Sequence, residues 1–358
     1  MADTAAIGGD PERESQPQNR PGWIGVAAIV AVTTGALTYV ISQVSFDELI
    51  TAFAGADYRW LLPYLTALTL FYWLKAIRWS QLLRPVAVYR VRQLWPAMMA
   101  GFAFNNLLLA HLGEFVRMNA FSRQSGVPRT TVLSTIALER LFDVIAILAF
   151  FSYGLLAVDG VDESLRYAGV VFLAASICGI VGAAAYVWKT DLVIRSATAL
   201  LNTLRVPAAV TTKVMGLATS GAGGLAALRD PSLLLGIATT SLLQWALNGS
   251  LVWVSLEAFG LHVSAAVACL VLATVAFSVL LPSTPGYFGV IQGAFVLAMS
   301  GLPDFEQSQS TIVAASIFYH AAQWVPVTVV GLIGYRMTLG SRLRAPGHAD
   351  QAGRRSSR

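Results

Sequence analysis

Six long apolar stretches constrain this chain more than any other feature of its sequence. Each is close to the roughly 20 mostly apolar residues that a membrane-spanning helix needs. They cover residues 23–42, 58–78, 131–156, 167–188, 232–258 and 311–336. Only 12% of the 358 residues are charged, whereas soluble proteins carry roughly 25%. So few charges cannot cover the surface of a soluble enzyme, and the high hydrophobicity excludes a disordered protein. The sequence therefore predicts an all-α polytopic membrane protein with six full transmembrane helices.

Two further apolar stretches, 91–121 and 264–301, are too long for one helix, and each is interrupted. The first contains His111-Leu-Gly-Glu114 and the second contains Pro282-Ser-Thr-Pro-Gly286. Backbone outside helices is tolerated inside a membrane only where protein or a water-filled cavity surrounds it. We therefore expect two re-entrant helical hairpins, which bring the total to about eight to ten hydrophobic segments. The alternative is that both stretches form complete short helices, and the chain then crosses ten times.

Lys and Arg are distributed unevenly among the segments that connect these stretches. With the N-terminus in the cytoplasm, nearly all of the 24 basic residues fall on the cytoplasmic side. Arg59 and Arg166 fall outside, and Arg140 lies within a helix. Because basic loops stay in the cytoplasm, we expect both termini to be cytoplasmic.

The chain is predicted to form one transmembrane domain over residues 23–338. Its ends, 1–22 and 339–358, are polar and rich in Pro, Gly and Arg, and we expect them to be disordered. Within the domain, the linker 190–230 contains apolar residues that recur with the period of a helix. This pattern predicts an amphipathic helix on the cytoplasmic surface of the membrane.

The two interrupted stretches resemble each other. When Phe104–Phe115 is aligned with Phe277–Phe288, the residues Phe, Leu-Leu, Gly and Phe coincide. The halves of the domain, about 23–156 and 167–338, would then have opposite orientations in the membrane. Inverted repeats with broken helices at matching positions are typical of transporters. We expect the substrate site where the two broken segments meet.

Three charged residues, Glu139, Arg140 and Asp143, lie inside the apolar stretch 131–156. A charge near the centre of a bilayer costs about 2.5–3.5 kcal/mol or more, so these residues must pair or line a wet cavity. Arg140 and Asp143 are three residues apart and can pair on a helix. Two interpretations remain open: a structural ion network between helices, and a headgroup or proton site.

Four further charged residues are candidates for a phosphate site. Arg117, three residues after Glu114, is expected to face the vestibule of the first hairpin, where its guanidinium can bind phosphate with two hydrogen bonds. The alternative for Arg117 is an ordinary cytoplasmic anchor. Lys75 and Arg78, at the end of the second span, complete this site or extend to the membrane interface.

The second break offers a different kind of site. Ser283 and Gly286 lie between or beside Pro282 and Pro285, where backbone N–H groups are unpaired. They form an anion or hydroxyl site if a helix starts at Tyr287, and otherwise only a tight turn.

His320 lies in the middle of the last span, where a histidine usually forms hydrogen bonds between helices. If it pairs with Glu139 or Asp143 instead, the three residues form a proton relay.

Three ordered motifs resemble those of a known family. They are Leu112-Gly-Glu-Phe-Val-Arg117, Glu139-Arg-Leu-Phe-Asp143, and Leu281-Pro-Ser-Thr-Pro-Gly286 followed by Gly289. Over roughly residues 25–338 the chain resembles the lysylphosphatidylglycerol synthase transmembrane (flippase-like) family. The resemblance implies a protein of the plasma (inner) membrane that moves aminoacylated phospholipid between leaflets. It also implies functional roles for Glu114, Arg117, Glu139, Arg140, Asp143, Pro282, Pro285 and Gly286.

The chain departs from this family in two places. It has His111-Leu112 where many members have a positively charged residue, and no stretch resembles the soluble synthase domain. The resemblance therefore does not imply lysyl transfer.

The leading hypothesis is a translocase for a membrane lipid with a phosphate-bearing headgroup. One alternative is a glycosyltransferase that uses a polyprenyl-phosphate donor, with Asp47-Glu48 as its acidic pair. Another is a non-catalytic partner of a lipid-modifying enzyme. The sequence has no soluble catalytic motif, phosphate-binding loop or Cys/His metal spacing, so we expect neither cofactor nor metal. We expect no nucleic-acid partner, whereas a homodimer and a lipid-synthesis enzyme stay open as protein partners.

Overall fold

The computed structural model describes most of the predicted transmembrane domain. The described residues are 31, 34, 35, 38–42, 44–108, 111–160, 163–188, 195, 198, 199, 201, 203, 226–280, 285–302 and 308–340. The predicted disordered N-terminus, nearly all of the C-terminal tail, and most of the predicted amphipathic linker lie outside these residues. Within them, the regular structure is entirely helical.

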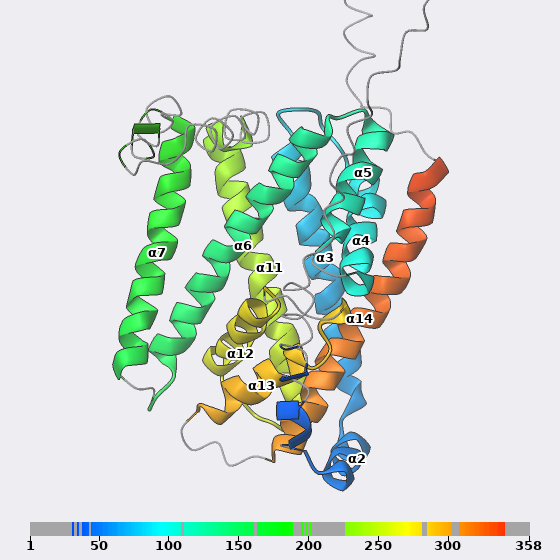
Figure 1. Cartoon of the computed structure of the whole chain (residues 1–358), viewed down its shortest axis with the longest axis vertical. Coiled ribbons are helices and arrows are strands. Elements are labelled where there is room, and N and C mark those ends of the chain that lie inside the picture. The colour runs from blue at the N-terminus through cyan, green and yellow to red at the C-terminus, as the bar shows by residue number, and fades with distance from the viewer. Residues whose placement is uncertain are drawn as a thin grey trace, which may run out of the picture.

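The described helices follow one another along the chain without an intervening strand (Figure 1). Their bounds are α2 Phe46–Gly55, η1 Tyr58–Trp60, α3 Leu61–Leu83, α4 Val91–Leu107, α5 Gly113–Ser125, α6 Arg129–Ala157, α7 Glu163–Trp188, η2 Ala226–Arg229, α11 Pro231–Glu257, α12 Ala265–Ser278, η3 Pro285–Tyr287, α13 Val290–Ser300 and α14 Gln309–Gly340.

Five long helices, α3, α6, α7, α11 and α14, coincide with five of the six apolar stretches. The sixth stretch, 23–42, lies mostly outside the described residues. By length and composition, Tyr58–Leu83 and Gln309–Gly340 are each apolar enough to cross a membrane. The start of α11 is fixed by Asp230, whose side chain accepts hydrogen bonds from the backbone N–H groups of Ser232 and Leu233. Hydrogen bonds from Ser232 lower the pKa of this exposed carboxyl.

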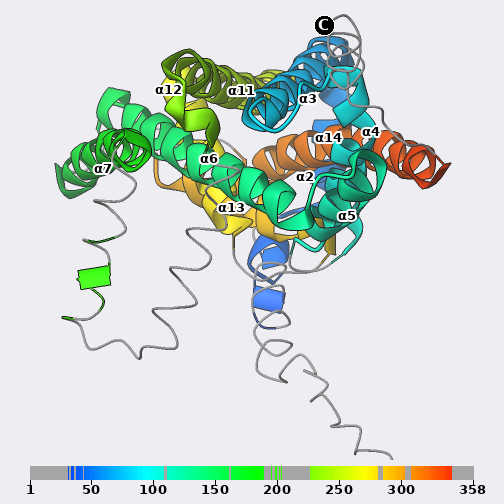
Figure 2. The ribbon, with the colours of Figure 1, turned by 90° about the horizontal axis from the view of Figure 1, so that it is seen from above.

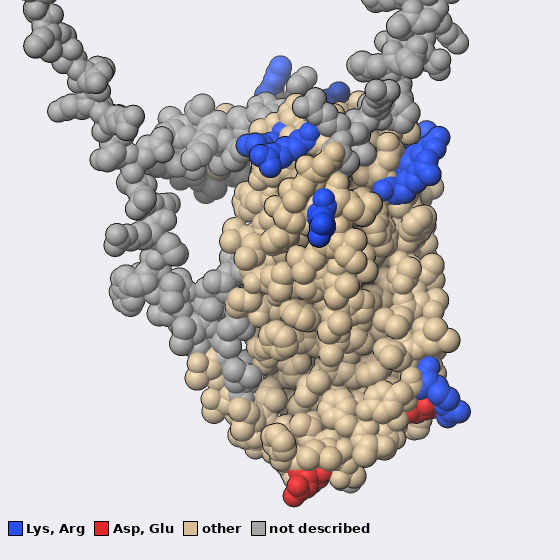
Figure 3. Space-filling model, turned by 90° about the vertical axis from the view of Figure 1, so that its right-hand side faces the viewer, with Lys and Arg blue, Asp and Glu red and all other residues tan. Residues whose placement is uncertain are grey.

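The two interrupted stretches form two pairs of contacting helices, α4 with α5 and α12 with α13. In Figure 1, the first pair lies toward the upper end of the molecule and the second toward the lower end. On the face drawn in Figure 3, most basic side chains gather at the upper end and the acidic ones at the lower end. The broad surface between them carries little charge.

The breaks in the two helix pairs differ in detail from those that the sequence predicts. In the first, α4 ends at Leu107 and α5 begins at Gly113, so Glu114 already belongs to a helix. In the second, α13 begins at Val290 and not at Tyr287. Tyr287 itself has a left-handed backbone with φ 60°, which is incompatible with the first residue of an α-helix. The condition for an anion site there, a helix start at Tyr287, is therefore not met, which leaves the alternative of a tight turn.

Helix α14 is central to the fold, with contacts to α2, α3, α4, α5, α11 and α13. Figure 2 shows it from above, lying between α3 and α5. Its closest approach to α4 is at Gly331, where an added Cβ would collide with the Met99 carbonyl oxygen and the Ala103 side chain. Glycine lets two helix backbones approach closely, which is a common way of packing helices in membranes.

We expect Gly331→Ala to lower the temperature at which the purified protein unfolds in detergent. Overpacking a filled contact costs about 1–3 kcal/mol, and here the obstructing atoms include backbone. Gly293→Ala in α13 is the matched control, because the nearest atom to its added Cβ would be 3.9 Å away. If both substitutions had the same effect on the unfolding temperature, the α4–α14 contact would not depend on Gly331.

Candidate functional site

A cavity of about 580 Å³ lies where the two breaks meet in the interior of the helix assembly. Helices α3, α4, α5, α6, α11, α12, α13 and α14 contribute to its walls, together with η3. Among the described residues, four charged side chains line it, namely Lys75, Glu114, Arg140 and Asp143. The cavity therefore combines apolar walls with both signs of charge.

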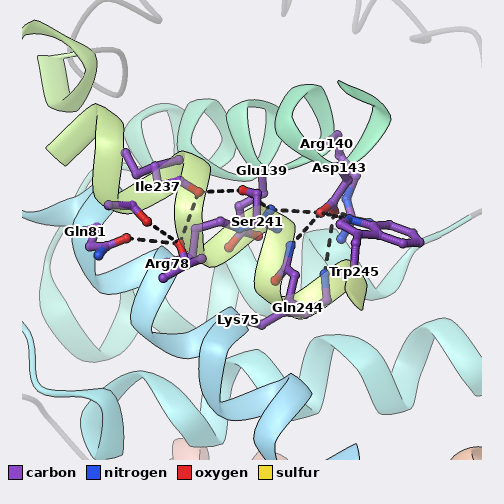
Figure 4. Close-up of polar contacts among 12 residues, drawn as sticks. Lys75, Arg78, Gln81, Glu139, Arg140, Asp143, Ile237, Ser241, Gln244 and Trp245 are labelled. Atoms are coloured by element: carbon purple, nitrogen blue, oxygen red, sulfur yellow. Dashed lines mark hydrogen bonds and ion pairs between the residues drawn. The ribbon is translucent and has the colours of Figure 1, made fainter. Parts of the chain in front are cut away.

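Asp143 on α6 is the hub of the polar contacts beside this cavity (Figure 4). Its Oδ1 accepts hydrogen bonds from Arg78 Nη1 at 2.8 Å, Gln244 Nε2 at 2.9 Å and Trp245 Nε1 at 3.0 Å. Arg78 comes from α3, and the other two donors come from α11. One buried carboxylate therefore connects three helices.

The second oxygen of Asp143 faces two more cations. Lys75 Nζ lies 3.6 Å from Oδ2, and Arg140 Nη1 lies 3.5 Å from it. Arg140 also donates a hydrogen bond of 2.7 Å from Nη2 to Glu114 Oε1, at the start of α5. The predicted pair of Arg140 and Asp143 is present, and it continues into the first helix pair.

Arg117 does not face the cavity, which corrects the expectation from the sequence. Its guanidinium forms two hydrogen bonds to Glu139, of 2.6 and 3.1 Å, and lies 3.7 Å from the centre of the Trp79 ring. Both members of the ion pair are buried, and neither lines the cavity. The pair joins α5 to α6, as a structural contact would. Arg78 is also fully buried outside the cavity wall, so Lys75 and Arg140 are the basic residues that reach it.

The charges of this region do not cancel. The cluster contains four basic residues, Lys75, Arg78, Arg117 and Arg140, and three acidic residues, Glu114, Glu139 and Asp143. With all of them ionised, the cluster carries one excess positive charge. This balance favours an anionic group in the cavity.

The two breaks touch each other at the cavity. His111 Nε2 and Tyr287 Oη lie 3.2 Å apart, and both residues have positive φ. Gly286 also has a left-handed backbone, with φ 76°, and hydrogen-bonds His320 through its backbone. Pro285 begins this 3₁₀ turn, whereas Pro282 and Ser283 lie outside the described residues.

His320 does not contact the carboxylates with which the proton relay was predicted. Its Nδ1 lies 3.3 Å from Gln292 Nε2, and among the described residues it is not linked to Glu139 or Asp143. The predicted proton relay is therefore not formed, and His320 connects α14 to the second break and to α13. The acidic residues Asp47 and Glu48 are exposed in the first turn of α2, outside the cavity wall.

The sequence analysis did not single out Trp245, Tyr287 or Asn105 as site residues. Aromatic residues are ordinary in apolar spans, so nothing marked Trp245 as a hydrogen-bond donor to Asp143. Asn105 could have been found, since two consecutive asparagines interrupt the apolar stretch 91–121.

We expect Glu139→Gln to lower the stability of the purified protein by about 3–5 kcal/mol, because it leaves the buried Arg117 without a counter-charge. The double variant Arg117→Met, Glu139→Leu should recover most of this loss, since it removes both charges. Thermal unfolding followed by tryptophan fluorescence in detergent measures both effects. A double variant less stable than Glu139→Gln would contradict an unpaired buried charge as the cause of the loss.

The comparison with known proteins agrees with the family resemblance of the three motifs. The family model described as the lysylphosphatidylglycerol synthase TM region matches residues 23–331. Neither a curated protein nor a solved structure matches the chain. The matched region contains both breaks, the cavity and the whole charge cluster. Because the match covers most of the 358 residues, the chain belongs to the lysylphosphatidylglycerol synthase transmembrane-region family of integral membrane proteins.

Proposed function

We propose that this protein moves a polar-headed lipid between the two leaflets of the plasma membrane, and that the phosphate of the headgroup binds in the central cavity. The observation that carries this proposal is the pair of cations, Lys75 and Arg140, on the wall of a cavity where two broken helices meet. A lipid tail can stay in the bilayer while such a cavity shelters the headgroup from hydrocarbon.

Arg140 is the best candidate for direct contact with phosphate. Its side chain is 44% exposed, whereas those of Arg78 and Arg117 are 0% and 1% exposed. A guanidinium has five N–H donors, and the two contacts with Glu114 and Asp143 use only part of this capacity. The planar arrangement of these donors suits the oxygens of a phosphate. Lys75 supplies a second positive charge from α3.

The arrangement of the helix pairs supports re-entrant hairpins related by an inverted repeat. The α4–α5 pair and the α12–α13 pair lie toward opposite ends of the molecule, as Figure 1 shows. Their breaks meet at His111 and Tyr287 beside the cavity. Broken helices from two inverted halves commonly form the binding sites of secondary transporters.

The described contacts do not favour a glycosyltransferase. Its candidate acidic residues, Asp47 and Glu48, lie in the exposed first turn of α2, and Glu48 accepts a hydrogen bond from Ser308. Neither residue lines the cavity.

We expect Arg140→Gln to abolish lipid translocation by protein reconstituted in vesicles, with little change in the unfolding temperature. Arg140→Lys should also be impaired, because an ammonium cannot present the same planar donors. Translocation is measured with phospholipids that carry the fluorophore on an acyl chain and keep a natural headgroup. Arg123→Gln, in the exposed last turn of α5, is the matched control and should be silent. Normal translocation by folded Arg140→Gln protein would overturn the proposed phosphate site.

Asp143 is unsuitable for this test. Its removal together with Arg140 would leave Arg78 buried without the carboxylate that it binds. Loss of translocation by such a double variant would therefore report misfolding as readily as loss of the site.

The proposed orientation places the α3–α4 connection in the cytoplasm and the start of α14 outside. In a protein whose Cys178 and Cys269 are replaced by serine, we expect Ser308→Cys to react with an impermeant maleimide in intact cells. Val88→Cys, exposed between α3 and α4, should react only after the cells are permeabilised. The reverse pattern would show that the chain is inserted the other way round.

A further inference from the structure

We propose that the cavity selects an anionic lipid whose phosphate carries a neutral, hydroxyl-rich group, such as a polyol or a sugar, and that it disfavours an aminoacylated, cationic headgroup. This inference rests on the proposed function, because it names the class of lipid that the same cavity takes. It also sets this chain apart from the lipid named in the description of its family, which carries a lysyl group.

The acidic residues at the cavity are already engaged by cations. Among the described residues, Asp143 is contacted by Lys75, Arg78 and Arg140. Glu114 is held by Arg140 at 2.7 Å. An ammonium group would have to displace a guanidinium from a carboxylate, and it would add to a cluster that already has an excess positive charge.

The cavity is larger than a phosphate requires. Its volume of about 580 Å³ lies within the range of roughly 300–1,000 Å³ typical of pockets that enclose whole small molecules. A phosphate at Arg140 therefore leaves room in the cavity for a further headgroup element.

Part of the cavity wall is polar but uncharged. Asn105 on α4, together with Gln323 and Trp324 on α14, contributes to this part. Asn105 is 8% exposed, and its Oδ1 has no hydrogen-bond partner among the residues that the structure describes. The neighbouring Asn106 is different, because its amide already donates to Thr328 Oγ1 at 3.0 Å.

The indole of Trp324 offers a complementary group. Its Nε1 is buried beside Gly286, and in the described part of the chain it likewise has no partner. Buried polar atoms in native proteins are nearly always hydrogen-bonded, so two orphans on one cavity wall point to a ligand that satisfies them. A hydroxyl group suits either atom, since it can accept a hydrogen bond from the indole N–H or donate one to the amide oxygen. A primary ammonium can only donate.

The test compares headgroups in vesicles that contain the reconstituted full-length protein. The four probes are acyl-labelled phosphatidylglycerol, phosphatidic acid, phosphatidylethanolamine and lysyl-phosphatidylglycerol. We expect phosphatidylglycerol to move fastest and the lysylated lipid slowest. Asn105→Leu and Trp324→Phe, which each remove one hydrogen-bonding group, should slow phosphatidylglycerol about 2- to 10-fold and leave phosphatidic acid unchanged.

Matched controls are Asn119→Leu and Trp73→Phe. The Asn119 amide bonds only within α5 in the described contacts, and Trp73 is 47% exposed on α3; neither lines the cavity. Both controls should leave the order of the four lipids unchanged. If Asn105→Leu does not fold, Gln323→Leu removes an amide from the same wall at a less buried position.

The outcomes separate this inference from the proposed function. If the lysylated lipid moves as fast as phosphatidylglycerol, or if the wall variants slow all four lipids equally, the selectivity proposed here is wrong while translocation stands. If the wild-type protein moves none of the four lipids, translocation of these phospholipids is itself refuted, and the selectivity with it.

Discussion

The interior of this protein depends on the cost of placing charge in an apolar surrounding. The seven charged side chains of the cluster lie among helices whose other residues are mostly apolar, and each unpaired charge there would cost several kcal/mol. Asp143 resolves most of this problem, because its two oxygens face cations and donors from α3, α6 and α11. The same network positions Arg140 at the cavity, so the element that stabilises the helices also prepares the site.

The cluster contains two kinds of ion pair, which differ in exposure and in role. Arg117 and Glu139 are enclosed and bidentate, and they fix α5 against α6. Arg140 is held at its edges by Glu114 and Asp143, but much of its side chain remains accessible. A buried pair that satisfies itself has no capacity for a ligand, whereas a half-exposed guanidinium retains it. This difference is why we assign phosphate to Arg140 and not to Arg117.

The sequence predicted the long helices well and the contacts between them poorly. Apolar stretches of about 20 residues are a property of local composition, so five of the long helices could be placed from residue order alone. The spacing of Arg140 and Asp143 likewise predicted their pairing, because residues three apart face the same side of a helix. Arg117 and Glu139 meet only through the packing of two helices, and the left-handed backbone of Tyr287, which delays α13 to Val290, has no signature in residue type.

The most extensive helix contacts join segments from different halves of the chain, α4 with α14 and α3 with α11. At Gly331 the backbones of α4 and α14 pack directly against each other. A rearrangement that kept both contacts would carry α4 along with α14, and α3 along with α11, as rigid units. Each rigid unit would then combine helices from both halves of the sequence.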